Sequence, residues 1–311
     1  MSEFDEIQSI LRERADLNAR LSLLPYEGTP ETKTVKGQKY LYIRKRVASK
    51  VTSTYVGIYS DDLYQALLRS TAEAKDLRKQ IRKLEKKLAE LGHREGELLP
   101  RVVLNIDFAR ANIKSSIYDQ AVLEGVATSF PQTEEIIDNG KVSGVTASDV
   151  QKILNLKHAW EFILDPDVIQ ARSEYYVLCH IAKLVNEGFF ADGGRIRGVP
   201  VTIGGTTYIP PLPIEHVVRE DIEKILASDA DDVDKAVRLC LYTMKTQVFI
   251  DGNKRAGIIY ANHYLIAHGL GLLVIPEAQV PEFKKLLVEY YEGADEKIIM
   301  AFMKTKCRKT F

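Results

Sequence analysis

The amino-acid sequence predicts a mainly α-helical protein with two short β-hairpins and one coiled-coil helix. Three observations lead to this fold class. Apolar residues recur at helical spacing over most of the chain beyond residue 100. Over residues 61–91 they repeat on alternating three- and four-residue steps, the spacing of a coiled-coil seam. Two stretches, 40–57 and 199–211, are instead rich in β-branched and aromatic residues next to turn-forming residues.

Composition and charge set few limits on function. Of the 311 residues, 45% are hydrophobic and 28% are charged, which is ordinary for a soluble globular protein. Because 43 Lys and Arg balance 43 Asp and Glu, no overall field favours nucleic acid or an anionic membrane. The acidic start Met1-Ser-Glu-Phe-Asp-Glu is unlike a signal peptide, and no apolar run of ~18 residues follows. Three cysteines are too few for a disulfide framework or a zinc site. We therefore expect a cytoplasmic protein without a membrane partner.

Residues 1–60 are predicted to form an N-terminal helix and a β-hairpin. Apolar residues over 1–24 have helical spacing, whereas residues 40–44 and 50–57 have the composition of paired strands. The basic residues of this hairpin are Lys39, Arg44, Lys45, Arg46 and Lys50. They are suited to contact nucleic acid, but a basic hairpin edge also prevents aggregation, and we favour this second interpretation.

Residues 61–99 are predicted to be a coiled-coil helix followed by a linker. The seam residues are Leu67, Ala74, Leu77, Ile81, Leu84, Leu88 and Leu91, with Ser70 at a polar position. A sustained seam predicts a homo-oligomer. Residues 75–87 contain seven Lys and Arg against two Asp and Glu, which we interpret as a solvated helix face rather than a nucleic-acid or acidic-partner contact. Glycines at 92 and 96 break the helix.

Residues 100–311 are predicted to be one helical domain. The expected helices are 104–128, 147–164, 167–187, 214–227, 230–247, 253–268 and 277–305. One stretch differs: residues 199–211 alternate apolar and polar side chains around Gly204-Gly205, which predicts a lone β-hairpin closed by Pro210-Pro211. Trp160 is most simply a core anchor, and the histidines His263 and His268 are most simply core or surface groups rather than metal ligands.

The densest chemistry lies at residues 249–257, Phe-Ile-Asp-Gly-Asn-Lys-Arg-Ala-Gly, directly before the apolar helix 253–268. The N-terminus of a helix attracts anions through its unpaired N–H groups and its dipole. Gly252 allows a tight turn, and Asn253 is suited to cap the helix or to donate an amide hydrogen bond. Lys254 and Arg255 offer charges for phosphate, and Asp251 is a suitable Mg²⁺ ligand. The turn therefore predicts a phosphate site.

This string resembles the motif of the Fic/Doc family, His-x-Phe-x-(Asp/Glu)-Gly-Asn-x-Arg-x-x-Arg. Fic proteins usually transfer AMP from ATP to a hydroxyl group of another protein, and Doc toxins transfer phosphate. The predicted hairpin 199–211 is similar to the family's flap, which holds the target segment by strand addition, and residues 191–197 are similar to the stretch that leads into it. Residues 122–125, Val-Leu-Glu-Gly, resemble part of the family's inhibitory helix motif. The resemblance covers about residues 100–295.

The resemblance implies a role for each matching residue. Asp251 would ligate Mg²⁺, and the backbone amides of Gly252, Asn253 and Lys254 would hold phosphate. Arg255 would contact the phosphates, and Phe249 would be a core anchor. The flap would be centred on Thr202, Ile203, Gly204 and Gly205. The implied partners are ATP or another nucleotide and a protein target.

The sequence departs from the motif at three positions. Gln247 stands where the family has its catalytic histidine, and a carboxamide cannot accept the proton that a general base removes. Ile258 stands where the second arginine binds the terminal phosphate of ATP, as in Doc-like members. Glu124 lacks the usual Ser or Thr four residues earlier, where this chain has Gln120. Glu124 is therefore interpreted as a capping or surface residue, with a relic of autoinhibition and a base for water as alternatives.

Three functions follow from these features. The first is a Fic-fold nucleotide-binding protein whose transfer activity is weak, altered or lost. The second is a regulatory module that holds a protein partner through the flap and the coiled coil. The third is an active transferase, AMP- or phosphate-transferring, whose base is supplied by Glu124 or by the target.

Overall fold

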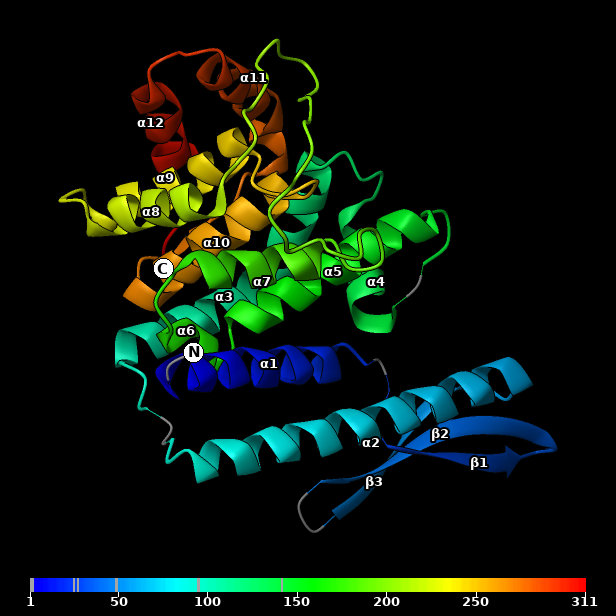
Figure 1. The fold of residues 1–311 in the computed structure, drawn as a ribbon. Helices are drawn as coiled ribbons and strands as arrows, with labels where there is room; N and C mark the ends of the chain where they lie inside the picture. Colours follow the sequence, from blue (N-terminus) through cyan, green and yellow to red (C-terminus); the bar gives the residue numbers. More distant parts are fainter. Residues whose placement is uncertain (1–2, 25, 27, 48–49, 94–95, 141) are drawn as a thin grey trace. The chain divides into compact units, whose positions relative to one another are not determined.

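The computed structural model describes residues 3–311, apart from 25, 27, 48–49, 94–95 and 141. The chain divides into two compact units, Met1–Arg94 and Glu95–Phe311 (Figure 1). None of the helices in the described part of the chain combines the length and apolarity needed to cross a bilayer.

The N-terminal unit contains two helices and a three-stranded antiparallel sheet. Its elements are α1 (Glu3–Leu23), β1 (Thr29–Val35), β2 (Gln38–Val47), β3 (Lys50–Ile58) and α2 (Asp61–Glu90). The strand order is β1-β2-β3, so β2 is the central strand. The Ser60 side chain caps α2 by accepting a hydrogen bond from the Leu63 N–H.

The heptad residues of α2 are buried inside this unit. Leu67 packs with Leu41 and Ile43 of β2, and Leu88 packs with Ile10 and Leu11 of α1. Figure 1 shows the sheet along the N-terminal half of α2 and α1 alongside its C-terminal half. The coiled-coil spacing is therefore satisfied by elements of the same unit, and the oligomeric state stays a prediction.

The sheet extends the predicted hairpin by one strand. Residues 40–44 and 50–57 do pair, as β2 and β3, but β1 pairs with β2 on the other side. Strand β1 has the sequence Thr-Pro-Glu-Thr-Lys-Thr-Val, which contains few apolar residues and therefore does not predict a strand. As an edge strand, it is held mainly by its ladder of backbone hydrogen bonds to β2. Lys39, Arg44, Lys45 and Arg46 thus lie on a central strand, and their interpretation as protection of a hairpin edge is wrong. Lys50 begins the edge strand β3, and for it this interpretation stays a prediction.

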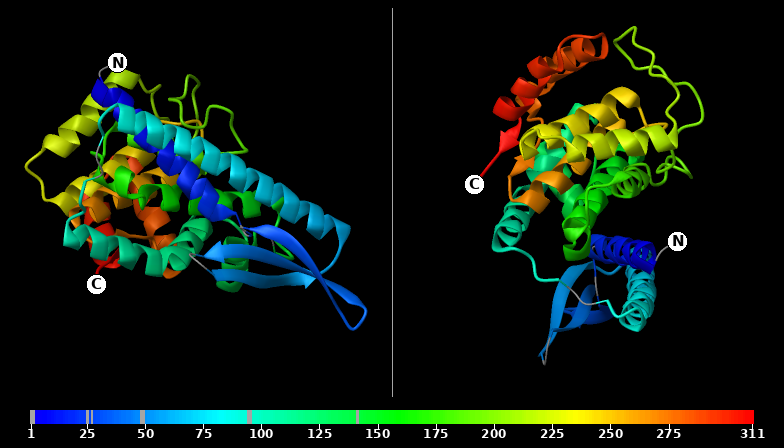
Figure 2. Two further views of the ribbon diagram at one scale, coloured as in Figure 1. Left: turned by 90° about the horizontal axis from the view of Figure 1, so that it is seen from below. Right: turned by 60° about the vertical axis from the view of Figure 1, so that its left-hand side comes forward.

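The C-terminal unit is helical. Its helices are α3 (Pro100–Leu123), α4 (Phe130–Asn139), α5 (Ala147–Ile163), α6 (Pro166–Gln170), α7 (Tyr175–Val185), α8 (Glu215–Ala227), α9 (Asp232–Thr246), α10 (Asn253–His268), the 3-10 turn η1 (Glu277–Gln279), α11 (Val280–Tyr291) and α12 (Glu296–Lys306). The short strands β4 (Leu272–Leu273) and β5 (Arg308–Lys309) pair with each other. Helix α10 packs against α3, α5, α7 and α9 and forms the centre of the unit (Figure 2).

The polar residues of the central helix are paired within the core. His263 is fully buried; its Nδ1 lies 2.7 Å from Ser173 Oγ, and its Nε2 lies 2.7 Å from the Val168 carbonyl oxygen. Trp160 is buried and donates to Gln120 Oε1 at 3.3 Å. Trp160 is therefore a core anchor, as predicted, and of the two possibilities for His263, core or surface, the structure shows the core.

Two helix predictions are wrong in detail, and one helix was not predicted. Residues 167–187 form two helices, α6 and α7, and in the non-helical segment 171–174 between them the Ser173 carbonyl oxygen accepts from Tyr260 Oη at 2.6 Å. Residues 277–305 also form two main helices, separated at Gly293, whose φ of 104° is incompatible with a helix. Helix α4 was not predicted, although Ser129 and Gln132 form a capping box at its start.

The flap segment 199–211 is a loop without strands, so its prediction as a β-hairpin is wrong. The turn itself is present at Gly204-Gly205, where Gly205 has φ 84°. Pro200, Pro210 and Pro211 offer no N–H to a strand ladder. The Thr206 hydroxyl instead donates to Glu292 Oε1 at 2.9 Å, which ties the segment to the residue that follows α11.

Candidate nucleotide-binding turn

The turn between α9 and α10 has the backbone that a helix-terminal anion site requires. Helix α9 ends at Thr246, and α10 begins at Asn253, directly after Gly252, as predicted. Gly252 has φ 73°, and a Cβ on it would lie 2.7 Å from Asn186 Oδ1. The position therefore accepts only glycine. The first N–H groups of α10, which an α-helix leaves without intrahelical acceptors, follow directly.

Asn253 holds the turn together. Its Oδ1 accepts from the Phe249 N–H at 2.9 Å, and its Nδ2 donates to the Phe249 carbonyl oxygen at 2.8 Å. The residue at the N-cap is Gly252, and no side chain caps α10. Of the two predicted roles, capping is thus wrong, and the amide of Asn253 serves the loop itself. Phe249 is fully buried, which confirms it as a core anchor.

Gln247 occupies the first position after α9 in a left-handed conformation, with φ 47°. Its Nε2 donates to the Met244 carbonyl oxygen at 2.6 Å, and its Oε1 accepts from Asn253 Nδ2 at 3.0 Å. Both ends of the carboxamide are therefore used inside the turn. A non-glycine residue in this conformation is strained, and the two hydrogen bonds help to hold it there.

Arg255 is buried at the first turn of α10, with a side chain that is 4% exposed. Its Nη2 lies 2.9 Å from Asp251 Oδ2, and its Nη1 donates to the Val185 carbonyl oxygen at 2.9 Å. Asp251 and Arg255 therefore lie on the same side of the turn, as a joint phosphate and metal site requires. Ile258, one helical turn further, is a core residue.

Glu124 reaches the same place from the C-terminal end of α3. Its Oε2 lies 3.4 Å from Arg255 Nε, and its Oε1 lies 3.7 Å from Lys254 Nζ. The side chain is only 14% exposed, so the interpretation as a surface residue is wrong, although Glu124 does stand at the C-cap of α3. A buried carboxylate thus lies against both cationic side chains of the turn.

Asn186 supports the turn from the end of α7. Its Nδ2 donates to the carbonyl oxygens of Asp251 and Gly193, at 2.9 and 3.1 Å. Its Oδ1 is buried without a hydrogen-bond partner. The sequence carries no signal for this residue, because its partners lie up to 65 positions away.

Arg197 fastens the flap to the turn, and its role was also not predicted. Its guanidinium donates to the Gln247 carbonyl oxygen at 2.5 Å, to that of Val199 at 2.8 Å and to that of Pro211 at 2.6 Å. The Arg197 N–H also donates to the Val248 carbonyl oxygen at 3.0 Å. One buried cation thus joins both ends of the flap to the backbone at the Gln247 position. In the flap itself, Thr202, Gly204 and Gly205 are exposed and Ile203 is partly buried.

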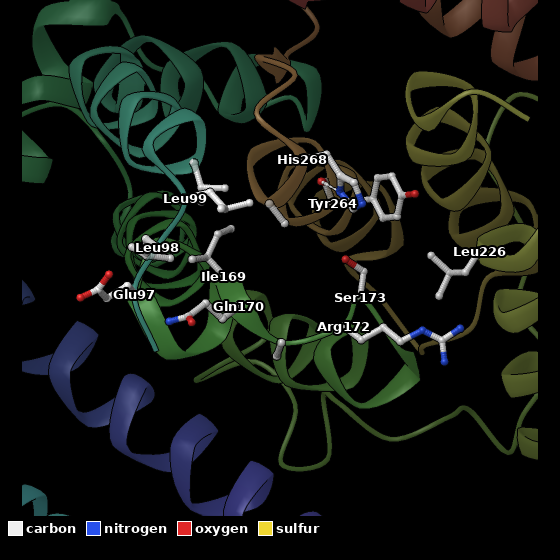
Figure 3. A pocket seen from close by; sticks show the side chains of 13 residues that line it. Glu97, Leu98, Leu99, Ile169, Gln170, Arg172, Ser173, Leu226, Tyr264 and His268 are labelled. Atoms are coloured by element: carbon white, nitrogen blue, oxygen red, sulfur yellow. Dashed lines mark hydrogen bonds between the residues drawn. The ribbon is translucent and has the colours of Figure 1, made fainter. Parts of the chain in front are cut away.

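One hollow of this unit borders the turn, and another lies away from it. A hollow of about 560 Å³ is lined by Ile250 of the turn, Arg197 and Val199 at the base of the flap, and Tyr176 and Cys179 of α7. A second one, of about 500 Å³, lies at the opposite end of α10 among Arg172, Ser173, Tyr264 and His268 (Figure 3). Of these two, the first has a residue of the turn in its lining and is therefore placed to receive a side chain beside the turn.

The donor set for a metal ion is small. No cluster of three or more His, Cys, Asp or Glu side chains suited to a metal occurs among the residues that the structure describes. Asp251 is the one carboxylate of the turn itself, and its side chain is 55% exposed.

Comparisons with known proteins find matches to the part of the chain that contains the turn. The model of the Fic/DOC family matches residues 173–265, which include the turn and the flap. The model of a domain of unknown function (DUF6788) matches residues 4–65 of the N-terminal unit. A search of curated protein sequences finds no match.

Solved structures with Fic domains are similar to this chain. A fragment of Fic-1 from C. elegans (aa134–508) shares 18% identity, with a TM-score of 0.54 over 79% of this chain and 74% of the fragment. A Fic-domain-containing signaling protein from Bacteroides thetaiotaomicron shares 15% identity, with a TM-score of 0.52 over 67% of this chain and 85% of its own. A Fic family protein from Desulfovibrio desulfuricans shares 16%, with a TM-score of 0.52 over 68% and 73%. The chain therefore has the Fic fold, and the family match supports its assignment to the Fic/Fido family.

Proposed function

We propose that this protein binds a nucleotide at the turn before α10 and is related to the enzymes that transfer AMP to protein hydroxyl groups. Its own transfer activity is weak, altered or lost. The observation that carries the proposal is the pair formed by Asp251 and Arg255 at 2.9 Å, directly beside Gly252, after which α10 begins.

Phosphate recognition rests on charge and on the helix terminus. The amides of Gly252, Asn253 and Lys254 would hold phosphate oxygens, and Lys254 and Arg255 would neutralise their charge. Lys254 has a partly exposed side chain, so it is the more accessible of the two cations. A nucleotide entering this site has to displace the Glu124 carboxylate from the two cations.

The residues present fit a Mg²⁺ ion that arrives with the nucleotide. Mg²⁺ usually takes one or two protein carboxylates, keeps several waters and completes its shell with phosphate oxygens. Asp251 supplies one half-exposed carboxylate beside the predicted phosphate position. When bound, the ion would neutralise phosphate charge.

Gln247 determines the catalytic part of the proposal. At the family's base position it offers a carboxamide, which holds a hydroxyl group or a phosphate but takes no proton. Both ends of that carboxamide are engaged with Met244 and Asn253, which supports a structural rather than a chemical role. Loss of a general base typically costs ~10²–10⁴ in rate.

Ile258 bears on the choice of nucleotide. Without an arginine at this position, selectivity for ATP over ADP or AMP should fall. The same substitution leaves a Doc-like phosphotransferase as an alternative within the same site.

Glu124 is proposed to hold the site in a closed state. Its carboxylate pairs with the cations that a phosphate would need, which favours autoinhibition over a role as a base for water. A charged group already at the site also fits the second candidate function, a regulatory module that holds a protein partner through the flap and does not catalyse transfer.

Calorimetry with ATP, ADP and AMP, each with and without Mg²⁺, tests the proposal. We expect binding that Lys254→Gln weakens about tenfold, the effect of losing one charge-assisted hydrogen bond. Lys224→Gln removes the charge of a lysine on α8, whose side chain is 69% exposed, and should leave binding unchanged. Absence of heat with all three nucleotides in the presence of Mg²⁺ would contradict nucleotide binding and leave the regulatory module.

A further inference from the structure

The N-terminal sheet has one face that its own unit leaves uncovered. Leu41 and Ile43 of β2 pack onto Leu67 of α2. Because successive side chains of a strand point to opposite faces, the alternate residues of β2 lie on the outer face. These are Tyr40, Tyr42 and Arg44.

Neighbouring strands add tyrosine and lysine to this outer face. Tyr55 of β3 pairs with Tyr42, and their rings meet edge to face at 5.6 Å between centroids. Lys33 of β1 lies over the Tyr42 ring, with Nζ 4.5 Å from its centroid. Glu31 is an acidic residue on the same face, 3.7 Å from Lys33 Nζ. Tyr55 is 54% exposed although it is a large aromatic residue.

The formal charge of the chain is divided between its two units. Residues 1–94 contain 19 Lys and Arg against 13 Asp and Glu, whereas the remaining residues contain 24 against 30. The zero net charge of the chain therefore hides a basic N-terminal unit. Its long helix α2 adds a shallow groove whose lining contains four cations, Lys75, Arg78, Lys79 and Arg82, together with Ala72 and the acidic Asp76.

Protection of a strand edge does not explain these cations. Lys39, Arg44 and Lys45 all lie on β2, which is hydrogen-bonded on both sides, and a central strand has no open edge to protect. Cations interleaved with exposed aromatic side chains are instead typical of nucleic-acid surfaces.

We propose that the outer face of β1-β2-β3 binds duplex DNA. Strands lie about 4.8 Å apart, so the axes of the two outer strands of this sheet are about 9.6 Å apart, which is within the major-groove width of about 12 Å. The Tyr42 and Tyr55 rings pack on each other, and Lys33 covers the Tyr42 ring. The face therefore presents hydroxyl groups and cations to phosphates and base edges, rather than open ring faces for stacking with unpaired bases.

Fluorescence anisotropy with the full chain and a labelled 24-base-pair duplex tests this proposal. We expect micromolar affinity at 50 mM salt, as for sequence-independent binding. If three to four phosphates are contacted, affinity should fall roughly 40- to 150-fold at 200 mM salt. Arg44→Gln should weaken binding about fivefold and reduce the salt slope by about one unit.

Two further variants separate this face from general charge. Tyr55→Thr keeps a residue suited to a strand and should also weaken binding, without any change in charge. Arg195→Gln makes the same charge change as Arg44→Gln at an exposed site of the other unit and should have no effect. The proposal is overturned by an absence of binding at ~100 μM protein and 50 mM salt, by an equal effect of Arg195→Gln, or by tighter binding of the single strand of the same sequence.

Discussion

Asn253 fixes the side chain of Gln247: its Nδ2 lies 3.0 Å from Gln247 Oε1. The same Nδ2 also donates to the Phe249 carbonyl oxygen, so one amide joins the end of α9, the middle of the loop and the start of α10. This arrangement gives Gln247 a firm position next to the site where phosphate is proposed to bind. Chemistry at this position should therefore depend on which side chain stands there.

Gln247→His should raise the transfer of labelled AMP from ATP to protein. An imidazole at this position supplies the missing base, worth ~10²–10⁴ in rate, and histidine tolerates the left-handed backbone better than most residues. Gln247→Asn is the matched control, because it keeps a carboxamide and offers no base. Equal transfer by the two variants would show that position 247 does not limit the chemistry.

Glu124→Ala should increase the affinity for ATP about tenfold, because the phosphates no longer compete with a carboxylate for Lys254 and Arg255. Glu135→Ala, an exposed acid on α4, makes the same charge change away from the site and should have no effect. Calorimetry of both variants measures the difference. Affinity that falls in Glu124→Ala would mean that the carboxylate supports binding instead of opposing it.

The parts of the site that depend on near neighbours were predictable from the sequence. One such part is the start of α10 after Gly252, and another is the position of Asp251 and Arg255 on the same side of the turn. Both are determined by the short loop between α9 and α10 and by the first turn of α10. The burial of Phe249 follows in the same way from an apolar residue between two apolar helices. In each case, the residues that determine the geometry lie within a few positions of each other.

The parts that depend on distant segments were not predictable. Arg197 meets the Gln247 carbonyl oxygen across 50 positions, and Glu124 reaches Arg255 only because the end of α3 meets the start of α10. The heptad spacing of α2 is also ambiguous. The same repeat suits a second chain or the α1 helix and sheet of the same unit, and spacing alone does not distinguish them.

Arg197→Met should lower the free energy of unfolding by about 2–3 kcal/mol, because the carbonyl oxygens that its guanidinium satisfies lose their charged donor. The flap should also exchange its amide hydrogens faster, since its two ends are no longer joined. Arg197→Lys should recover part of the stability, because an ammonium group keeps the charge but not the planar fork. Urea unfolding and hydrogen exchange measure these effects.

The neighbouring Arg195 provides the control for this series. Its side chain is 79% exposed, so Arg195→Met should change the free energy of unfolding by less than about 0.5 kcal/mol. If Arg195→Met and Arg197→Met lower the free energy of unfolding equally, the contacts of Arg197 are not what stabilises the flap.

His263 should make the protein less stable as the pH falls below 6.5. Complete burial lowers its pKa to about 4, so in the folded protein the ring stays neutral, with Nε2–H donating to the Val168 carbonyl oxygen and Nδ1 accepting from Ser173. The unfolded chain takes up the proton near its ordinary pKa of about 6.5. Between pH 7.5 and 5.0, this difference should therefore remove about 2 kcal/mol of stability, and the loss should stop below pH 4, where both states are protonated.

Urea unfolding of the wild type and of His263→Gln at pH 7.5 and 5.0 isolates this contribution, because all other titrating groups are common to both proteins. The variant should lose about 2 kcal/mol less than the wild type over that range. His216→Gln, which removes an exposed histidine, should keep the wild-type dependence. An NMR titration in which the His263 ring takes up its proton near pH 6.5 in the folded protein would contradict the prediction, because it would mean that the ring is open to water.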